Sequence, residues 1–328
     1  TQVDLMIVYV LGGMVQAGFG GLAVLAGVVV TALLALKFQL HTAIGKIEQK
    51  DIFAILQFVV LSVLVLPLLP DQAYVPYDVL EPRAIWRIVV IILGIDFFGY
   101  LLAKFIGQEK GALVTGVLGG FASSTAVTWS FARRSRRTKG GVGAYAGGIV
   151  LASSIMFPRI LIWLLIWNKT LFSELVLPIL LLAGLGVTLG IYIVRSEQSE
   201  EKMDHEPHNP LNLISALTFG LIYSGVLLLV AYSNDQFGDK GVFLASGLSG
   251  LTDVNAITIS MSKLGGDRLP LFVAHLAIVI GAVANSILKY AICLISGSPE
   301  LRKKVSVGFL PVVAVACLYL LVKGVLMG

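Results

Sequence analysis

Charged residues are scarce in this chain. Asp, Glu, Lys and Arg make up 13% of its 328 residues and apolar residues make up 57%, whereas soluble domains have about 25% charged residues. This composition excludes an ordinary soluble enzyme, a disordered chain and a coiled coil. Cysteine is also scarce, with Cys293 and Cys317 alone, and the composition excludes a disulfide-stapled secreted fold as well. The sequence predicts that most of the chain lies in lipid.

A strong excess of positive charge is lacking too. The net charge of +5 is ordinary for a membrane protein, in which Lys and Arg collect in cytoplasmic loops and contact lipid head groups. The single basic run, 133–139, lies between two apolar segments. We therefore expect membrane lipids and no nucleic acid as partners, and a homo-oligomer stays open. The chain begins at Thr1 and lacks the charged start of a signal peptide, so we expect that its beginning is missing.

Long apolar stretches dominate what is present. A helix needs about 20 apolar residues to cross the hydrocarbon core. The stretches that meet or approach this length are 3–17, 19–36, 52–69, 84–106, 141–167, 174–194, 211–232, 269–296 and 305–326. Two further apolar stretches, 111–132 and 241–262, are interrupted by glycine and small polar residues. A bilayer tolerates such a break only where protein or a water-filled cavity lines it.

The distribution of Lys and Arg favours a re-entrant path for both interrupted stretches. If each enters and leaves on the same side, 15 Lys and Arg fall on one side of the membrane and 6 on the other. The rich side is then cytoplasmic. If 111–132 crosses the membrane instead, this bias weakens.

The two interrupted stretches also belong to an internal repeat. Residues 111–134 align with 241–264 without a gap at an offset of 130. Residues 152–155 also match residues 284–287. Each unit is predicted to contain a helix, a broken hairpin, a long helix and another helix, in that order. Three crossings per unit would flip the second unit. We therefore predict an all-α polytopic membrane protein with two inverted-topology repeats, each of three transmembrane helices plus a re-entrant broken hairpin, preceded by about three additional helices.

The second break contains a carboxylate. A charged side chain near the bilayer centre needs a partner, a cation or a proton. Asp253, Thr252 and Asn255 offer oxygens of the kind that bind Mg²⁺ or Na⁺, so Asp253 and Asn255 are the expected metal ligands. Such an ion would be a substrate or coupling ion, and no resident cofactor is expected. Alternatively, Asp253 caps the helix that follows it, and the two roles are compatible.

The first break is uncharged. Ser123, Ser124 and Thr125 place hydroxyl groups at the start of a half-helix, which suits an anion or a partly hydrated cation. The alternative is close helix packing by small residues.

Several other polar residues lie within apolar segments and are secondary candidates. Asp96 could relay a proton or bind a second cation, unless it pairs with Lys289 or Arg159. Lys289 lies one helical turn from Asn285, and could instead reach the membrane surface. Ser153 aligns with Asn285 in the repeat. His275 could be a pH-sensitive gate, although a structural role is favoured.

Four motifs resemble those of one family. They are 119–128 with 131–134, 66–71, 81–86 and 249–258. These motifs resemble an uncharacterised bacterial membrane domain that is commonly fused behind an MgtC/SapB-like domain, and the resemblance runs from about residue 40 to the end. It implies a multi-pass protein of the bacterial inner (plasma) membrane, loosely linked to Mg²⁺ and stress, without a known substrate.

The repeat and the resemblance together set the predicted domains. The resemblance makes 1–37 the tail of an MgtC-like domain. Residues 38–83 form a connecting helix and loops. Repeat 1 is 84–194, a cytoplasmic linker is 195–210 and repeat 2 is 211–328. The linker is rich in His and carboxylates, so metal sensing is an alternative to a solvated connection.

The predicted function is that of a secondary transporter or carrier for a small ion, and not of an enzyme. The site would lie where the two hairpins face each other near the midplane. A divalent cation such as magnesium is preferred because a carboxylate with neutral oxygens suits it, and a small anion moved with protons is the alternative. Two other functions stay open. One is an intramembrane protease, with Asp96 and Asp253 as a dyad or Ser123 or Ser124 with His275. The other is a non-transporting regulator.

Overall fold

The protein is all-helical. A computed structural model describes residues 2–16, 18, 20, 23, 49–72, 77, 79–106, 112–137, 141–196 and 213–327. No β-strand occurs among these residues, and an isolated bridge joins Gly265 to Leu269. The chain divides into two compact units, Thr1–Ile52 and Phe53–Gly328. The first unit contains α1 (Gln2–Gln16), and the boundary falls within α4 (Gln49–Val59).

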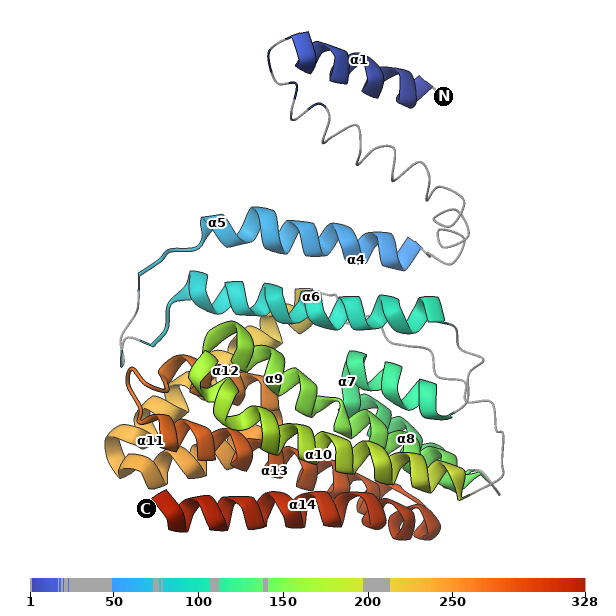
Figure 1. Ribbon diagram of the computed structural model, residues 1–328, viewed down its shortest axis with the longest axis vertical. Coiled ribbons are helices and arrows are strands. Elements are labelled where there is room, and N and C mark those ends of the chain that lie inside the picture. Colours follow the sequence, from blue (N-terminus) through green and yellow to red (C-terminus); the bar gives the residue numbers. More distant parts are fainter. Residues whose placement is uncertain are drawn as a thin grey trace. The chain divides into compact units, whose positions relative to one another are not determined.

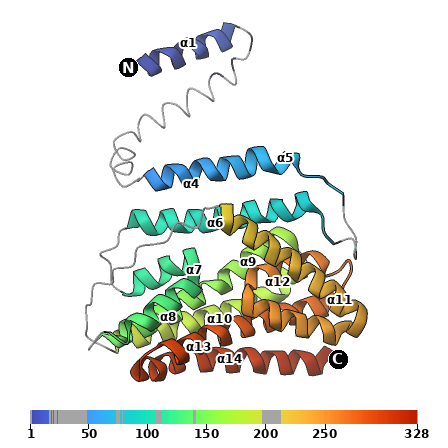
Figure 2. The ribbon, with the colours of Figure 1, turned by 180° about the vertical axis from the view of Figure 1, so that it is seen from behind.

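The larger unit holds the predicted repeats. After α4 come η1 (Val60–Val65), α5 (Leu66–Leu68), α6 (Pro82–Ile106), α7 (Ala112–Arg134), α8 (Val142–Ser154), α9 (Met156–Trp167), α10 (Lys169–Arg195), α11 (Leu213–Thr252), α12 (Val254–Leu264), α13 (Leu271–Ser296) and α14 (Pro299–Met327). Within this unit η1 and α5 lie along one edge with α6 next to them, and α14 lies along the opposite edge (Figure 1); the order is the same from behind (Figure 2).

Six stretches of the described residues are long and apolar enough to cross a membrane. They are Asp51–Leu68, Val142–Trp167, Lys169–Arg195, Ala216–Thr252, Leu271–Ser296 and Pro299–Val325. Their composition requires a lipid environment because long apolar faces remain uncovered, as on α14. The prediction of an all-α, multi-pass membrane protein is therefore confirmed.

The first interrupted stretch folds back on itself. Within α7, Ser123 has extended backbone angles (φ −166°, ψ 102°). Before the break, Gly116 packs on Gly148 and Gly120 packs on Ala152, so this arm runs parallel to α8. After the break, the ring of Phe131 packs edge-on against Tyr145, with centroids 5.6 Å apart. The second arm has thus returned past the level at which the first arm meets α8.

The second interrupted stretch has the same shape. Helix α11 turns at Gly238 (φ 58°, ψ −146°), and the chain breaks again at Asp253 (φ −156°, ψ 119°) before α12. Gly250 and Ile257, on either side of the break, both contact Gly281 of α13. Two arms that meet one neighbour at the same level form a hairpin.

The two hairpins approach α13 from opposite ends. The last turn of hairpin one is joined to the C-terminal end of α13, where the Arg136 guanidinium donates to the Ile295 carbonyl at 2.6 Å. Hairpin two ends near the start of α13, where Gly265 packs on Ala274. The tips of the hairpins therefore point toward each other along the middle of α13.

One predicted helix is two helices. The apolar stretch 141–167 divides into α8 and α9 at Ile155. The cause is Pro158, which has no N–H to donate to the carbonyl of Ser154. The break matters because it changes the direction of the helix just before Met156 and Arg159, which lie in the first turn of α9.

Parts of the predicted domain plan lie outside the described residues. These parts are most of the segment 1–37 and nearly all of the linker 195–210. The domain boundaries and the inverted relation of the repeats stay predictions.

Candidate functional site

The two hairpin breaks line one cavity. Its volume is about 130 Å³, roughly the volume that four water molecules occupy in the liquid. It is lined by Ser123, Ser124, Thr125, Met156, Arg159, Thr252, Asp253, Val254, Asn255 and Asn285. All six residues predicted at the two breaks are in this set, although they come from stretches 130 positions apart.

The first wall of the cavity is the start of the second arm of α7. Ser123 caps this arm, because its Oγ accepts a hydrogen bond from the Ala126 N–H at 3.2 Å. One turn later the Thr128 hydroxyl donates to the Ser124 carbonyl at 2.8 Å. The arm therefore presents its N-terminus, with a positive partial charge, to the cavity.

The opposite wall repeats this arrangement with a carboxylate. Asp253 caps α12, because its Oδ1 accepts from the N–H groups of Asn255 at 2.6 Å and Ala256 at 3.3 Å. The Thr258 hydroxyl then donates to the Val254 carbonyl at 2.7 Å. The contacts of Ala256 and Thr258 lie 130 residues after those of Ala126 and Thr128 in the first hairpin. Asp253 thus has the capping role that the sequence left open.

Two asparagines hold the second wall in place. The Asn255 Oδ1 accepts a hydrogen bond from the indole N–H of Trp163 in α9 at 3.1 Å. Asn285 of α13 donates through Nδ2 to the carbonyl of Gly250 at 2.9 Å. These side chains tie the hairpin tip to α9 and α13, so the cavity is supported by long helices.

A buried arginine reaches the cavity from α9. Only 9% of Arg159 is exposed, and a Coulombic interaction links it to Asp253. The sequence analysis considered Arg159 solely as a partner for Asp96. An arginine inside an apolar segment is functional by default, which is the signal that could have found it.

Lys289 lies directly behind the cavity. It is 1% exposed, and its Nζ contacts the Sδ of Met156, a lining residue, at 3.5 Å. Coulombic interactions connect this amine with both Arg159 and Asp253. Lys289 therefore does not reach the membrane surface, which corrects that alternative.

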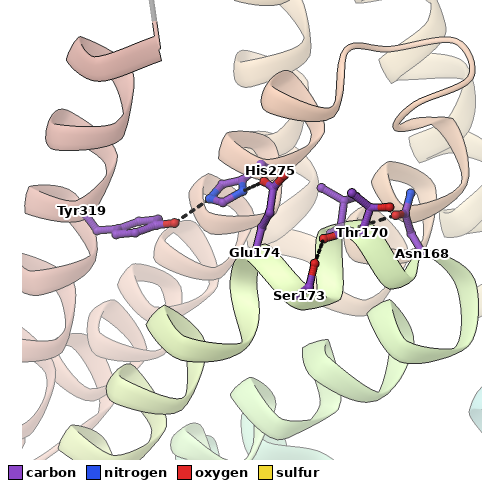
Figure 3. A network of polar contacts seen from close by, with 7 residues as sticks. Asn168, Thr170, Ser173, Glu174, His275 and Tyr319 are labelled. Carbon is purple, nitrogen blue, oxygen red and sulfur yellow. Dashed lines mark hydrogen bonds and ion pairs between the residues drawn. The ribbon is translucent and has the colours of Figure 1, made fainter.

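The remaining candidates lie elsewhere. His275 lies between Glu174 and Tyr319 and forms a hydrogen bond with each, as Figure 3 shows. Its Nδ1 is 2.9 Å from Glu174 Oε2, and its Nε2 is 2.6 Å from Tyr319 Oη. It is not among the described residues that line the cavity, so it is not paired with Ser123 or Ser124. Ser153 is buried in α8 and does not line the cavity. Asp96 is in α6, and its side chain lies outside the described part of the chain.

The charges around the cavity do not favour a metal ion. Arg159 and Lys289 are basic, and among the described lining residues Asp253 is the one carboxylate, whose Oδ1 already accepts from two backbone N–H groups. The Asn255 Oδ1 is engaged by Trp163. In the described residues, no group of three or more His, Cys, Asp or Glu side chains could hold a metal ion. The preferred divalent cation thus has few available oxygens here.

Comparison with known proteins covers this region. Residues 90–297 match the model of a family described as "Domain of unknown function (DUF4010)". An uncharacterized protein of Aquifex aeolicus (strain VF5) is 32% identical over 199 residues, which are 60% of this chain and 86% of that relative. No solved structure matches the chain. The matched range contains both hairpins and every residue that lines the cavity.

Proposed function

This chain belongs to the DUF4010 family, and we propose that it is a secondary transporter that moves a small anion together with protons. The observation that carries this proposal is the single cavity between two capped helix breaks, with Arg159 in its wall. As part of this proposal, the protein lies in the bacterial inner membrane and has no enzymatic activity.

A transport role is supported by the duplicated hairpins. Discontinuous helices that meet at the interface of two repeats are the usual binding site of secondary transporters. Here the tips meet along the middle of α13, and both breaks carry a side-chain cap at the corresponding position, Ser123 and Asp253. We propose that the two repeats have inverted topology, so that movement of one against the other opens the cavity to each side in turn.

An anion is supported by the sign of the charges. Two helix N-termini point into the cavity, and each attracts negative charge. Arg159 adds a permanent positive charge with several donors, and Lys289 adds a second cationic group behind Met156. Asp253 balances one of these charges while it caps α12. A small oxyanion or halide fits both the charge and the volume.

Lys289 is the group that we propose to carry the proton. A buried ammonium is costly unless an opposite charge is near. An anion in the cavity would supply that charge, so the anion and the proton would each favour binding of the other. The deprotonated amine would leave the site less positive and release the anion.

The alternatives have less support. A cation carrier for Mg²⁺ or Na⁺ would need oxygens such as Asp253 Oδ1 and Asn255 Oδ1, and both of these already accept hydrogen bonds from the protein. A serine–histidine pair would need His275 at the cavity, whereas it contacts Glu174 and Tyr319.

Flux in liposomes tests the proposal. Purified full-length protein would be reconstituted with an internal pH-sensitive dye, and chloride, sulfate, phosphate and Mg²⁺ gradients would be applied in turn. We expect acidification driven by at least one anion gradient and none by Mg²⁺. Arg159→Gln should abolish this flux, and Arg195→Gln, an exposed charge on α10, should leave it unchanged. Mg²⁺ flux without anion flux, or full flux in Arg159→Gln, would contradict the proposal.

Lys289→Met separates coupling from binding. The variant replaces a buried amine with an apolar chain of similar length, so the fold should persist. We expect anion exchange to remain measurable with a labelled anion while the proton movement is lost. Proton movement at the wild-type rate would exclude Lys289 as the carrier.

A further inference from the structure

A second, larger cavity lies at the other end of hairpin one. Its volume is about 700 Å³, and it is enclosed by the last turns of α7, the turn that follows and the C-terminal end of α13. Its described lining residues are Trp129, Ser130, Arg133, Arg134, Arg136, Arg137, Ile295 and Ser296. None of these eight is acidic, so the pocket has a strongly positive potential.

Hydrogen bonds hold the turn that carries these arginines. Arg136 donates to the carbonyls of Ile295 at 2.6 Å and Gly297 at 3.4 Å. The Ser135 Oγ donates to the Ala132 carbonyl at 2.7 Å and accepts from the Ser298 N–H at 3.0 Å. The pocket is therefore a fixed junction between two helix ends.

One side of the pocket is apolar. Trp129 is 46% exposed, and the Arg133 guanidinium lies over its ring, 5.3 Å from the centroid. Ile295 is also exposed. Trp is enriched where the hydrocarbon core meets the head groups, and guanidinium groups bind phosphate oxygens in a bidentate fashion. The pocket thus combines a phosphate-binding part with an apolar wall.

Glu300, at the start of α14, does not compete for these arginines. Glu300 pairs with Lys304 one helical turn away, at 3.4 Å.

We propose that this pocket binds one anionic phospholipid, with its phosphodiester among Arg133, Arg136 and Arg137 and an acyl chain along Trp129 and Ile295. Basic pockets between transmembrane helices on the cytoplasmic side bind lipid head groups of this kind. The apolar wall distinguishes a lipid from free phosphate, which would gain nothing from Trp129. The proposal is independent of what the central cavity transports.

Native mass spectrometry of the purified full chain in nonionic detergent tests this site. Phosphatidylglycerol and phosphatidylcholine of equal chain length would be titrated, with and without excess inorganic phosphate. We expect preferential binding of one phosphatidylglycerol that inorganic phosphate does not displace. The double variant R133Q/R137Q should weaken this binding by about thirtyfold, because each basic residue near a lipid surface contributes about 1 kcal/mol and each 1.4 kcal/mol is a factor of ten.

Two matched variants serve as controls. R195Q/K303Q removes the same charge at exposed positions outside the pocket, and it should bind lipid as the wild type does. R133K/R137K keeps the charge and should retain most of the binding. Equal loss in both Gln variants would show a net-charge effect and overturn the site. Displacement by inorganic phosphate would make the pocket a phosphate site and overturn the lipid.

Discussion

At the scale of single residues, Asp253 has two separable roles. Its Oδ1 satisfies two N–H groups at the start of α12, and its charge balances a cationic neighbourhood. Asn preserves the acceptor and removes the charge, whereas Ala removes both. The pair of variants therefore distinguishes the cap from the charge.

We expect Asp253→Ala to destabilise the protein by about 1 kcal/mol relative to Asp253→Asn, the usual value of a lost N-cap. Thermal or denaturant unfolding in detergent would measure this difference. Equal stability of the two variants would mean that the cap contributes little.

At the scale of elements, close packing of glycines fixes the hairpins. A methyl group on Gly120 would lie 2.7 Å from the Ala152 Cα, and one on Gly250 would lie 2.7 Å from the Gly281 Cα. Backbone lies on both sides of these contacts, so neither neighbour can rotate away. The hairpin tips could not then keep their distance from α8 and α13.

Gly120→Ala and Gly250→Ala should each destabilise the protein by about 1–3 kcal/mol, the range for overpacking. Gly184→Ala on α10 is the control, because no atom lies within 4 Å of the added methyl group there. That control should be neutral or slightly stabilising, since Ala favours a helix over Gly. A similar loss of stability in all three variants would contradict the packing argument.

The elements also show how far the sequence could predict this fold. The breaks at Ser123 and Asp253 were predictable because glycine and polar residues interrupt apolar stretches. The break at Ile155 could also be predicted from Pro158, but the overall apolar character of 141–167 favoured one continuous helix. The positions of Arg159 and Lys289 could not be predicted. Which face of a buried helix meets the cavity depends on packing against several other helices.

At the scale of the whole membrane unit, two groups of loops come together at different helix ends. The turn after α7 joins the end of α13 through Arg136 and Ile295. In the second group of loops, the Asn168 side chain before α10 donates to the carbonyls of Ser262 and Gly265 at the end of α12. The proposed inversion of the repeats requires that these two groups lie on opposite sides of the membrane.

Cysteine labelling tests this arrangement. In a C317S background, where the remaining Cys293 is buried, Arg137→Cys and Asp267→Cys each introduce one exposed thiol. A membrane-impermeant maleimide should label Asp267→Cys in right-side-out vesicles and Arg137→Cys in inverted ones. Labelling of both thiols from one side would rule out opposed hairpins.

The central claim is that an anion binds between the hairpin tips, and an experimental density map of the protein in lipid with an electron-dense anion, such as iodide or selenate, tests it most directly. We predict a density peak within hydrogen-bonding distance of Arg159 and of the hydroxyl groups at 123–125, which is lost in Arg159→Gln. An empty cavity at saturating anion, or a peak coordinated by Asp253 that appears with Mg²⁺ instead, would contradict the account.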